Sequence, residues 1–108
     1  MNKEPFFSIV IPCLNEEKSL PLLLQDLVNQ TLQDFEVIVV DGNSKDKTVE
    51  NANKFKKRLP SLSILHSKIR NVSVQRNMGG EAGKGTYLLF NDADNRLHHP
   101  YSFGQRHF

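Results

Sequence analysis

The stretch that decides the fold is Phe35-Glu36-Val37-Ile38-Val39-Val40-Asp41. All of its residues from Phe35 to Val40 are apolar except Glu36, and such a continuous apolar run predicts a strand that is buried in a sheet. The sequence Asp41-Gly42-Asn43-Ser44 follows the run and is typical of a turn, so the strand should end there.

Strand and helix patterns alternate on both sides of this run. Residues 7–11 are apolar apart from Ser8 and stop at Pro12, which predicts another buried strand. Apolar residues recur at i, i+3, i+4 and i+7 from Leu20, which predicts a helix that Ser19 can cap, and Ser73 can cap a later one. The expected strands are residues 7–11, 35–40, 62–66 and 86–91. The expected helices are residues 20–28, 47–59 and 72–82.

This alternation predicts an α/β domain with a parallel sheet, right-handed crossovers and helices on both faces. In such sheets ligands bind beyond the carboxyl ends of the strands, where the strand order reverses. Polar side chains of three strands fall there: Asn15 and Glu16 after the first strand, Asp41 after the second, and Asp92 and Asp94 after the last. Packing alone does not readily explain three strands that end in acids.

Asp92 and Asp94 follow an apolar strand, and their i, i+2 spacing puts both side chains on one face of an extended chain. Two close carboxylates repel each other, and burying them is costly unless a cation lies between them. Mg²⁺ or Mn²⁺ is the expected occupant, because these ions accept carboxylate oxygen and keep positions open for phosphate. A solvated turn is the alternative interpretation, and the other strand-end acids favour the metal.

Three familiar phosphate sites do not fit the sequence. A GxGxxG dinucleotide fold needs glycines directly after the first strand, and residues 12–16 supply none. Residues 79–86 superficially resemble a P-loop, but Gly85 stands where Ser or Thr is required, and the segment precedes a strand instead of following one. An aspartyl phosphatase would carry its Asp-x-Asp after the first strand.

A nucleotide diphosphate held through a metal remains compatible with the sequence. Asp41 could accept a hydrogen bond from a base N–H or a ribose hydroxyl, and Asp94 could hold the cation. Arg76 and Lys84 could neutralise the remaining phosphate charge, and the bidentate fork of arginine suits this role better.

Length and composition narrow the class of protein. The 108 residues fit one domain, and a net charge of +2 with 24% charged residues argues against a nucleic-acid partner. The single cysteine, Cys13, excludes an intrachain disulfide and is expected to be a small buried residue. We find no run of 18 apolar residues and no signal sequence, so we expect a cytoplasmic protein, either free or peripheral at the inner face of the membrane.

Four ordered blocks of this sequence resemble family 2 glycosyltransferases, which have the GT-A fold. The first two blocks are the opening strand with Asn15-Glu16 and the second strand with its acidic turn. The third is Val74-Gln75-Arg76-Asn77-Met78-Gly79, which leads through Ala82-Gly83-Lys84-Gly85 into the strand that bears Asp-x-Asp. Together the blocks cover residues 7 to about 97.

The resemblance implies transfer of a sugar from a nucleotide-diphosphate donor, most readily a UDP-sugar, with inversion at the anomeric carbon. The acceptor would be a hydroxyl of a glycan or a lipid-linked molecule, in polysaccharide or glycolipid synthesis. The nucleotide-binding residues that it implies, together with those argued above, are Pro12, Asn15, Glu16, Asp41, Arg76 and Asp92. As metal ligands the resemblance implies Asp94, which would bind the ion directly, and Asp92, which would contact the ribose or, through water, the metal.

The resemblance also sets the expected domain organisation. Residues 1–97 would form a three-layer, Rossmann-like GT-A half-domain with a four-stranded, mainly parallel sheet ordered 3-2-1-4. Its fourth strand would be an unpaired edge, which favours self-association or marginal stability. Residues 98–108 would be an irregular tail, in which the adjacent His98 and His99 are expected in a solvated loop, with extra metal ligation as the alternative.

The general base is the one expected part for which we identify no candidate. Family domains continue past the Asp-x-Asp strand into the acceptor surface and the acidic base, whereas this chain ends at Phe108. The alternative to an active transferase is therefore a truncated, inactive remnant that still binds a nucleotide diphosphate and a metal.

Overall fold

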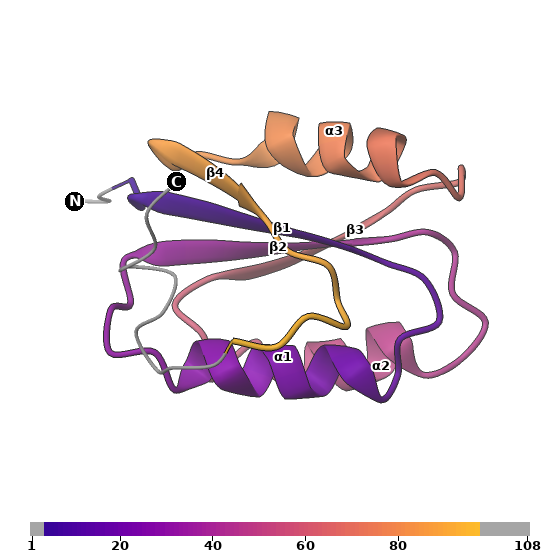
Figure 1. The fold of residues 1–108 in the computed structure, drawn as a ribbon, viewed down its shortest axis with the longest axis horizontal. Helices are drawn as coiled ribbons and strands as arrows, with labels where there is room; N and C mark the ends of the chain where they lie inside the picture. The colour runs from indigo at the N-terminus through magenta and orange to yellow at the C-terminus, as the bar shows by residue number, and fades with distance from the viewer. Residues whose placement is uncertain (1–3, 98–108) are drawn as a thin grey trace.

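Strands and helices alternate along the chain in the expected order (Figure 1). The computed structural model describes residues 4–97, so the expectations for the tail and for His98 and His99 lie outside the described residues. The strands are β1 (Phe7–Cys13), β2 (Phe35–Asp41), β3 (Leu62–His66) and β4 (Tyr87–Phe90). The helices are α1 (Ser19–Val28), α2 (Thr48–Asn53) and α3 (Val72–Ala82).

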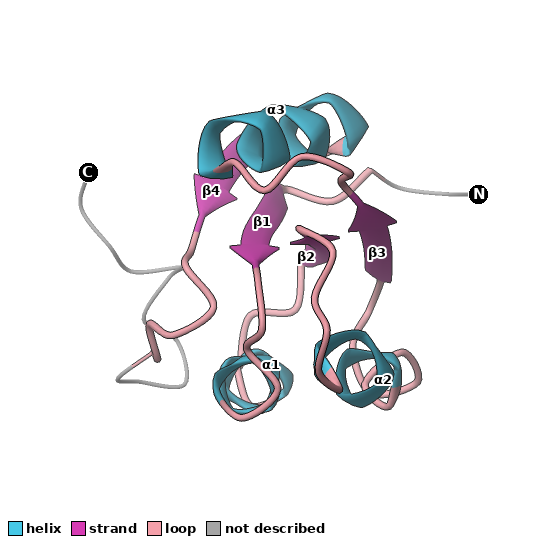
Figure 2. Ribbon diagram, turned by 90° about the vertical axis from the view of Figure 1, so that its right-hand side faces the viewer, coloured by secondary structure: helices cyan, strands magenta, loops and turns pink. Residues whose placement is uncertain are grey.

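The four strands form one sheet in the order β3-β2-β1-β4, and every neighbouring pair is parallel. Figure 2 shows α1 and α2 on one face of this sheet and α3 on the other. The α/β class, the three layers and the strand order are thus confirmed. The order reverses between β1 and β4, and this switch point is where the carboxyl ends of the strands open a site.

Apolar side chains of β1 and β2 point alternately to the two faces of the sheet and form two cores. The larger core includes Ile9, Ile11, Val37 and Val39 and packs against α1 and α2, whereas Val10, Ile38 and Val40 pack under α3. A Cβ on Gly79 of α3 would lie 2.3 Å from Val10 Cγ1. Only glycine therefore lets α3 approach β1 this closely.

Strand β1 continues through Pro12 to Cys13, so the prediction that Pro12 ends the strand is wrong. Val10 accepts a hydrogen bond from Asn91 N on the β4 side (3.0 Å), and Pro12 faces that side as well because strand residues alternate. The β4 pairing stops at Phe90, so no β4 acceptor is left for the N–H that proline lacks.

The two predicted helix caps, Ser19 and Ser73, and one predicted helix end are also wrong, whereas the bounds of the last helix are as expected. Lys18 is the N-cap residue of α1 without a side-chain hydrogen bond, and Asn71 caps α3 by accepting from Val74 N (3.1 Å). Helix α2 ends at Asn53, because the following turns use i→i−3 bonds such as Phe55 N to Ala52 O (3.0 Å).

Strand β4 lies at the edge of the described sheet and is poorly covered. Tyr87, Leu88 and Phe90 are 55%, 43% and 47% exposed. Self-association through this edge stays a prediction. Among residues 4–97, none of the helices has the length and apolar character needed to cross a membrane.

Candidate functional site

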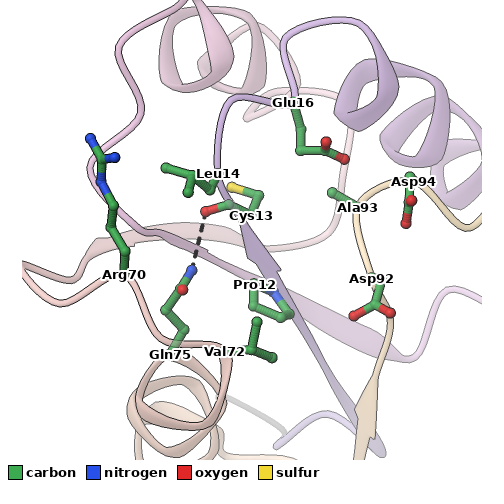
Figure 3. A pocket seen from close by; sticks show the side chains of 10 residues that line it. All are labelled: Pro12, Cys13, Leu14, Glu16, Arg70, Val72, Gln75, Asp92, Ala93 and Asp94. Carbon is green, nitrogen blue, oxygen red and sulfur yellow. Dashed lines mark hydrogen bonds between the residues drawn. The ribbon is translucent and has the colours of Figure 1, made fainter.

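A pocket of about 260 Å³ opens beyond the carboxyl ends of β1 and β4 (Figure 3). Its walls come from the end of β1 with the loop that follows, from the start of α3 with the loop before it, and from the segment after β4. The lining residues are Pro12, Cys13, Leu14, Glu16, Arg70, Val72, Gln75, Asp92, Ala93 and Asp94. The structure thus brings together four of the predicted residues, namely Pro12, Glu16, Asp92 and Asp94.

Asp92 and Asp94 project from a segment that is fixed by the residue between them. Ala93 is 3% exposed and belongs to the larger core, while both aspartates are exposed. Asp94 makes no side-chain hydrogen bond or ion pair with any residue of 4–97, and Asp92 has only Arg76 Nη2 at 3.5 Å. The buried alanine therefore holds two largely unneutralised carboxylates at the mouth of the pocket.

Glu16 adds a third carboxylate on the same side of the pocket (Figure 3). Burial raises the pKa of Glu16 above its ordinary value, and the charges of Asp94, Asp46 and Asp92 raise it further. Its backbone is anchored, since Glu16 N donates to Thr48 Oγ1 (2.8 Å). A bound cation would relieve the repulsion that this pKa shift reports.

The pocket carboxylates suit an ion such as Mg²⁺ that takes only part of its ligands from the protein, and not an ion that is coordinated by protein side chains alone. Within residues 4–97, no three His, Cys, Asp or Glu side chains are grouped closely enough to enclose a metal. Mg²⁺ is usually held by one or two carboxylates together with water and substrate phosphates. Asp92 and Asp94 can supply such a partial ligand set.

Asp41 and Asn15 lie at the same end of the sheet but do not line the pocket. Asp41 is 2% exposed and accepts hydrogen bonds from Asn43 N (3.1 Å) and from both N and Oγ of Ser44. Asn15 Oδ1 accepts from Lys45 N (2.8 Å), and Asn15 N donates to Ser44 Oγ (2.8 Å). Asp41 therefore holds the turn that follows β2, and Asn15 ties the loop after β1 to that turn. Contact of either residue with a nucleotide stays a prediction.

Arg76 lies beside the pocket, in a neighbouring hollow of about 460 Å³ that it shares with Asp92 and Asp94. Its guanidinium is 5.9 Å from the centroid of the Phe90 ring and 3.5 Å from Asp92. A phosphate bridging the two hollows could therefore reach it.

The prediction that Lys84 binds phosphate is wrong. Lys84 N donates to Glu36 Oε2, and Glu36 also accepts from Ser8 Oγ (2.6 Å). Ser8 and Glu36 pair near the amino ends of β1 and β2, so Lys84 is at the opposite end of the sheet from the pocket. Ser8 Oγ also accepts from Gly85 N (2.7 Å), which completes a buried polar network there.

Two residues of the pocket were missed by the sequence analysis. Gln75 is 3% exposed, and its Nε2 donates to Cys13 O (3.1 Å) and Val40 O (2.9 Å), tying α3 to the ends of β1 and β2 (Figure 3). Its i, i+4 relation to Gly79 was a usable signal, because both must face the sheet. Among residues 4–97, Arg70 is the only cationic residue that lines the pocket, and no motif distinguished it from other surface arginines.

Cys13 is 5% exposed, as predicted for a small buried residue. Burial raises its pKa to about 12, and the charges of Asp41 and Glu16 contribute to the same direction. The thiol is therefore protonated at neutral pH and is a wall of the pocket, not a nucleophile.

Comparison with known proteins identifies relatives for most of the chain. The sequence model of Glycosyl transferase family 2 matches residues 8–101. A PGL/p-HBAD biosynthesis glycosyltransferase of Mycobacterium bovis is 41% identical over 95 residues, which cover 87% of this chain and 37% of that protein. The chain thus spans little more than a third of the length of this relative.

Solved structures give the same result for the fold. S. aureus TarS 1-349 in complex with UDP superposes with a TM-score of 0.81 at 29% identity, covering 91% of this chain and 30% of that one. The mannosyltransferase PcManGT of Pyrobaculum calidifontis, solved with GDP-Man and Mn²⁺, has a TM-score of 0.82 at 22% identity, over 91% of this chain and 30% of that one. The second likeness shows the fold alone.

Proposed function

The chain belongs to glycosyltransferase family 2, and from this membership we propose that its pocket binds the nucleotide-diphosphate sugar donor of a transfer reaction. In that reaction the acceptor oxygen bonds to the anomeric carbon while the bond from this carbon to the diphosphate oxygen breaks, and the configuration inverts. The acceptor in this proposal is a hydroxyl of a glycan or a lipid-linked molecule, met at the cytoplasmic side of the membrane.

The observation that carries the proposal is the one-sided charge of the pocket. Glu16, Asp92 and Asp94 lie together on one side of it, and neither Glu16 nor Asp94 has a side-chain partner within residues 4–97. Carboxylates left in this way repel an anionic diphosphate unless a divalent cation joins the two. A bound Mg²⁺ or Mn²⁺ would also stabilise negative charge on the departing diphosphate.

Each proposed residue has a distinct task. Asp94 ligates the metal, and Asp92 ligates it directly or through water and also keeps Arg76 close. Arg76 neutralises phosphate charge with its fork of N–H donors. Pro12 forms the apolar floor for the nucleotide, and the hydrogen bonds of Gln75 keep that floor next to α3.

The donor nucleotide is proposed to carry uridine. TarS, whose fold superposes on this chain, has been solved in complex with UDP (29% identity over the aligned residues) and in complex with UDP-GlcNAc (31% identity). These complexes support a uridine diphosphate in the equivalent pocket here. The sugar itself is not specified by the described residues.

Calorimetric titration tests the proposal. UDP added to the 108-residue chain should bind in the presence of MnCl₂ and much more weakly in EDTA, and Asp94→Asn should remove the difference. Asp34→Asn is the matched control, because the Asp34 side chain accepts from Phe6 N (3.1 Å), next to the amino end of β1 and away from the pocket. Equal UDP binding with and without Mn²⁺ would contradict the metal-bridged site.

A transfer assay then separates an enzyme from a binding remnant. A radiolabelled UDP-sugar should be hydrolysed or transferred in a Mn²⁺-dependent way if the chain carries the activity of its family. Metal-dependent UDP binding without any turnover would favour the remnant.

A further inference from the structure

The two ends of the segment after β4, which carries Asp92 and Asp94, are hydrogen-bonded to each other. Asn91 Nδ2 donates to Asp92 O (3.0 Å) and to Asn95 O (2.9 Å), and Asn95 N donates to Asp92 O (3.0 Å). These bonds close the segment on itself, but they do not fix it relative to the other wall of the pocket.

Burial of Ala93 anchors the middle of the segment in the larger core, and Asp26 of α1 adds a polar attachment at the far end of the segment. Its Oδ1 accepts from Arg96 Nη2 (2.6 Å), while its Oδ2 accepts from Arg96 Nε (3.0 Å) and from Leu97 N (3.1 Å). The Asp26 side chain is only 11% exposed, compared with 53% for Arg96. Three hydrogen bonds on one nearly buried carboxylate are more than an incidental surface contact, because the pair is bidentate and also holds backbone.

Helix α1 is a rigid support for this carboxylate. Leu23, Leu24 and Leu27, which surround Asp26 in the helix, are each no more than 2% exposed and pack into the larger core. A carboxylate on such a helix has a fixed position, and its hydrogen bonds therefore also restrain the position of Arg96 and of Leu97 N. Figure 1 shows the segment after β4 running across to α1.

The attachment at Arg96 matters because like charges push the segment outward on both sides of the buried Ala93. Asp92 and Asp94 are exposed like charges, and Glu16 faces them from the loop after β1. Repulsion among the three favours conformations that move the segment away from Glu16. Arg96 lies two residues after Asp94, so its grip on Asp26 opposes that movement directly.

We infer that Asp26 is a positioning residue, which acts through Arg96 to hold Asp94 and Asp92 where a metal-bound diphosphate can reach them. This inference rests on the proposed function of the pocket. Asp26 itself touches neither metal nor substrate, since it lies at α1 behind the segment. Partners hydrogen-bonded directly to metal ligands typically change metal affinity 10–100-fold when they are replaced, and Asp26, which acts one step further away through Arg96, should have an effect at the lower end of that range, about 10-fold.

The test measures Mn²⁺ affinity by electron paramagnetic resonance, with MnCl₂ titrated into the 108-residue chain in the presence of UDP. Asp26→Asn should weaken Mn²⁺ binding about 10-fold, and Arg96→Gln, which removes the two side-chain bonds but keeps the bond from Leu97 N, should weaken it in the same direction. Arg58→Gln is the matched control, because Arg58 Nη2 also donates to a side chain of α1, at Gln25 Oε1 next to Asp26, but Arg58 has no hydrogen bond to the segment after β4 among residues 4–97.

A conservative variant separates positioning from a general effect on folding. Arg96→Lys keeps the charge but loses the bidentate geometry, so its Mn²⁺ affinity should fall between those of wild type and Arg96→Gln. Loss of thermal stability in these variants with unchanged Mn²⁺ affinity would overturn the inference. Wild type that binds no Mn²⁺ with UDP would instead overturn the proposed function, and the inference with it.

Discussion

Glu36 at the amino end of the sheet and the pocket carboxylates at the carboxyl end have opposite environments. At the amino end, Glu36 is 7% exposed and its Oε2 is satisfied by Ser8 Oγ and Lys84 N. At the carboxyl end, Glu16 and Asp94 face a pocket without a side-chain partner among residues 4–97. A carboxylate with its donors built in supports the fold, whereas one left without donors is available for a ligand that brings its own positive charge.

The largest effect expected from this contrast is on ligand binding at the carboxyl end. Asp94→Ala should reduce Mn²⁺-dependent UDP affinity more than about 100-fold, because even indirect partners of a metal contribute 10–100-fold. The melting temperature should stay close to that of wild type, since the side chain has no partner in the described fold to lose. Calorimetry and a thermal melt of the same sample measure both; a large loss of stability would remove the contrast.

The next effect is on stability at the amino end. Glu36→Ala leaves the Ser8 hydroxyl and the Lys84 N–H without their acceptor and should cost about 2 kcal/mol of unfolding free energy. Urea unfolding measures it, and UDP affinity of the folded fraction should not change. Glu81→Ala is the control, because Glu81 is an exposed acid at the end of α3; equal destabilisation by both would refute the structural role of Glu36.

Helix α3 connects the two ends, so its seating on β1 should affect both. Gly79→Ala would place a Cβ 2.3 Å from Val10 Cγ1 and should destabilise the fold by about 1–2 kcal/mol through overpacking. Gly80→Ala is a sharp control, since its Cβ would meet Leu88 Cδ1 at an ordinary 3.6 Å. It should be neutral or stabilise the helix by up to about 1 kcal/mol in urea unfolding.

The smallest effect concerns the pH dependence of the metal-free protein. The pKa of Glu16 is raised on folding from about 4.5, mainly by burial, so the folded state binds more protons than the unfolded state just above that pH. Glu16 therefore lowers stability as pH rises through this window. Glu16→Gln should flatten that part of the stability profile, measured by urea unfolding between pH 4 and 7, and a profile that keeps its slope in this variant would contradict the assignment to Glu16.

The sheet was predictable because its strands are continuous apolar runs between turn residues. The pattern of β1 and β2 decides burial on both faces, and crossover helices then leave few alternatives to a parallel order. Helix caps were less predictable. Asn71 and Ser73 could both cap α3, and the sequence does not show which side chain reaches a free N–H, while Ser19 lies inside α1 and not at its cap position.

The site was predictable as a set of strand ends but not as a set of contacts. Asp41 was correctly placed at the end of β2, yet the sequence does not show that its oxygens hold the turn of residues 42–44. Lys84 failed for a topological reason: a residue just before a strand must lie at the strand's amino end, away from the ligand end. Gln75 and Arg70 join the pocket through tertiary packing, which a local pattern does not encode.

The burial of Cys13 makes its reaction with thiol reagents a measure of local opening at the end of β1. Its thiol, with a pKa raised to about 12 and 5% exposure, should resist alkylation until the end of β1 swings free. The rate of iodoacetamide labelling then reports how often the end of β1 opens. A ligand bound in the pocket that Cys13 lines should lower this labelling rate, so binding can be followed without an added label.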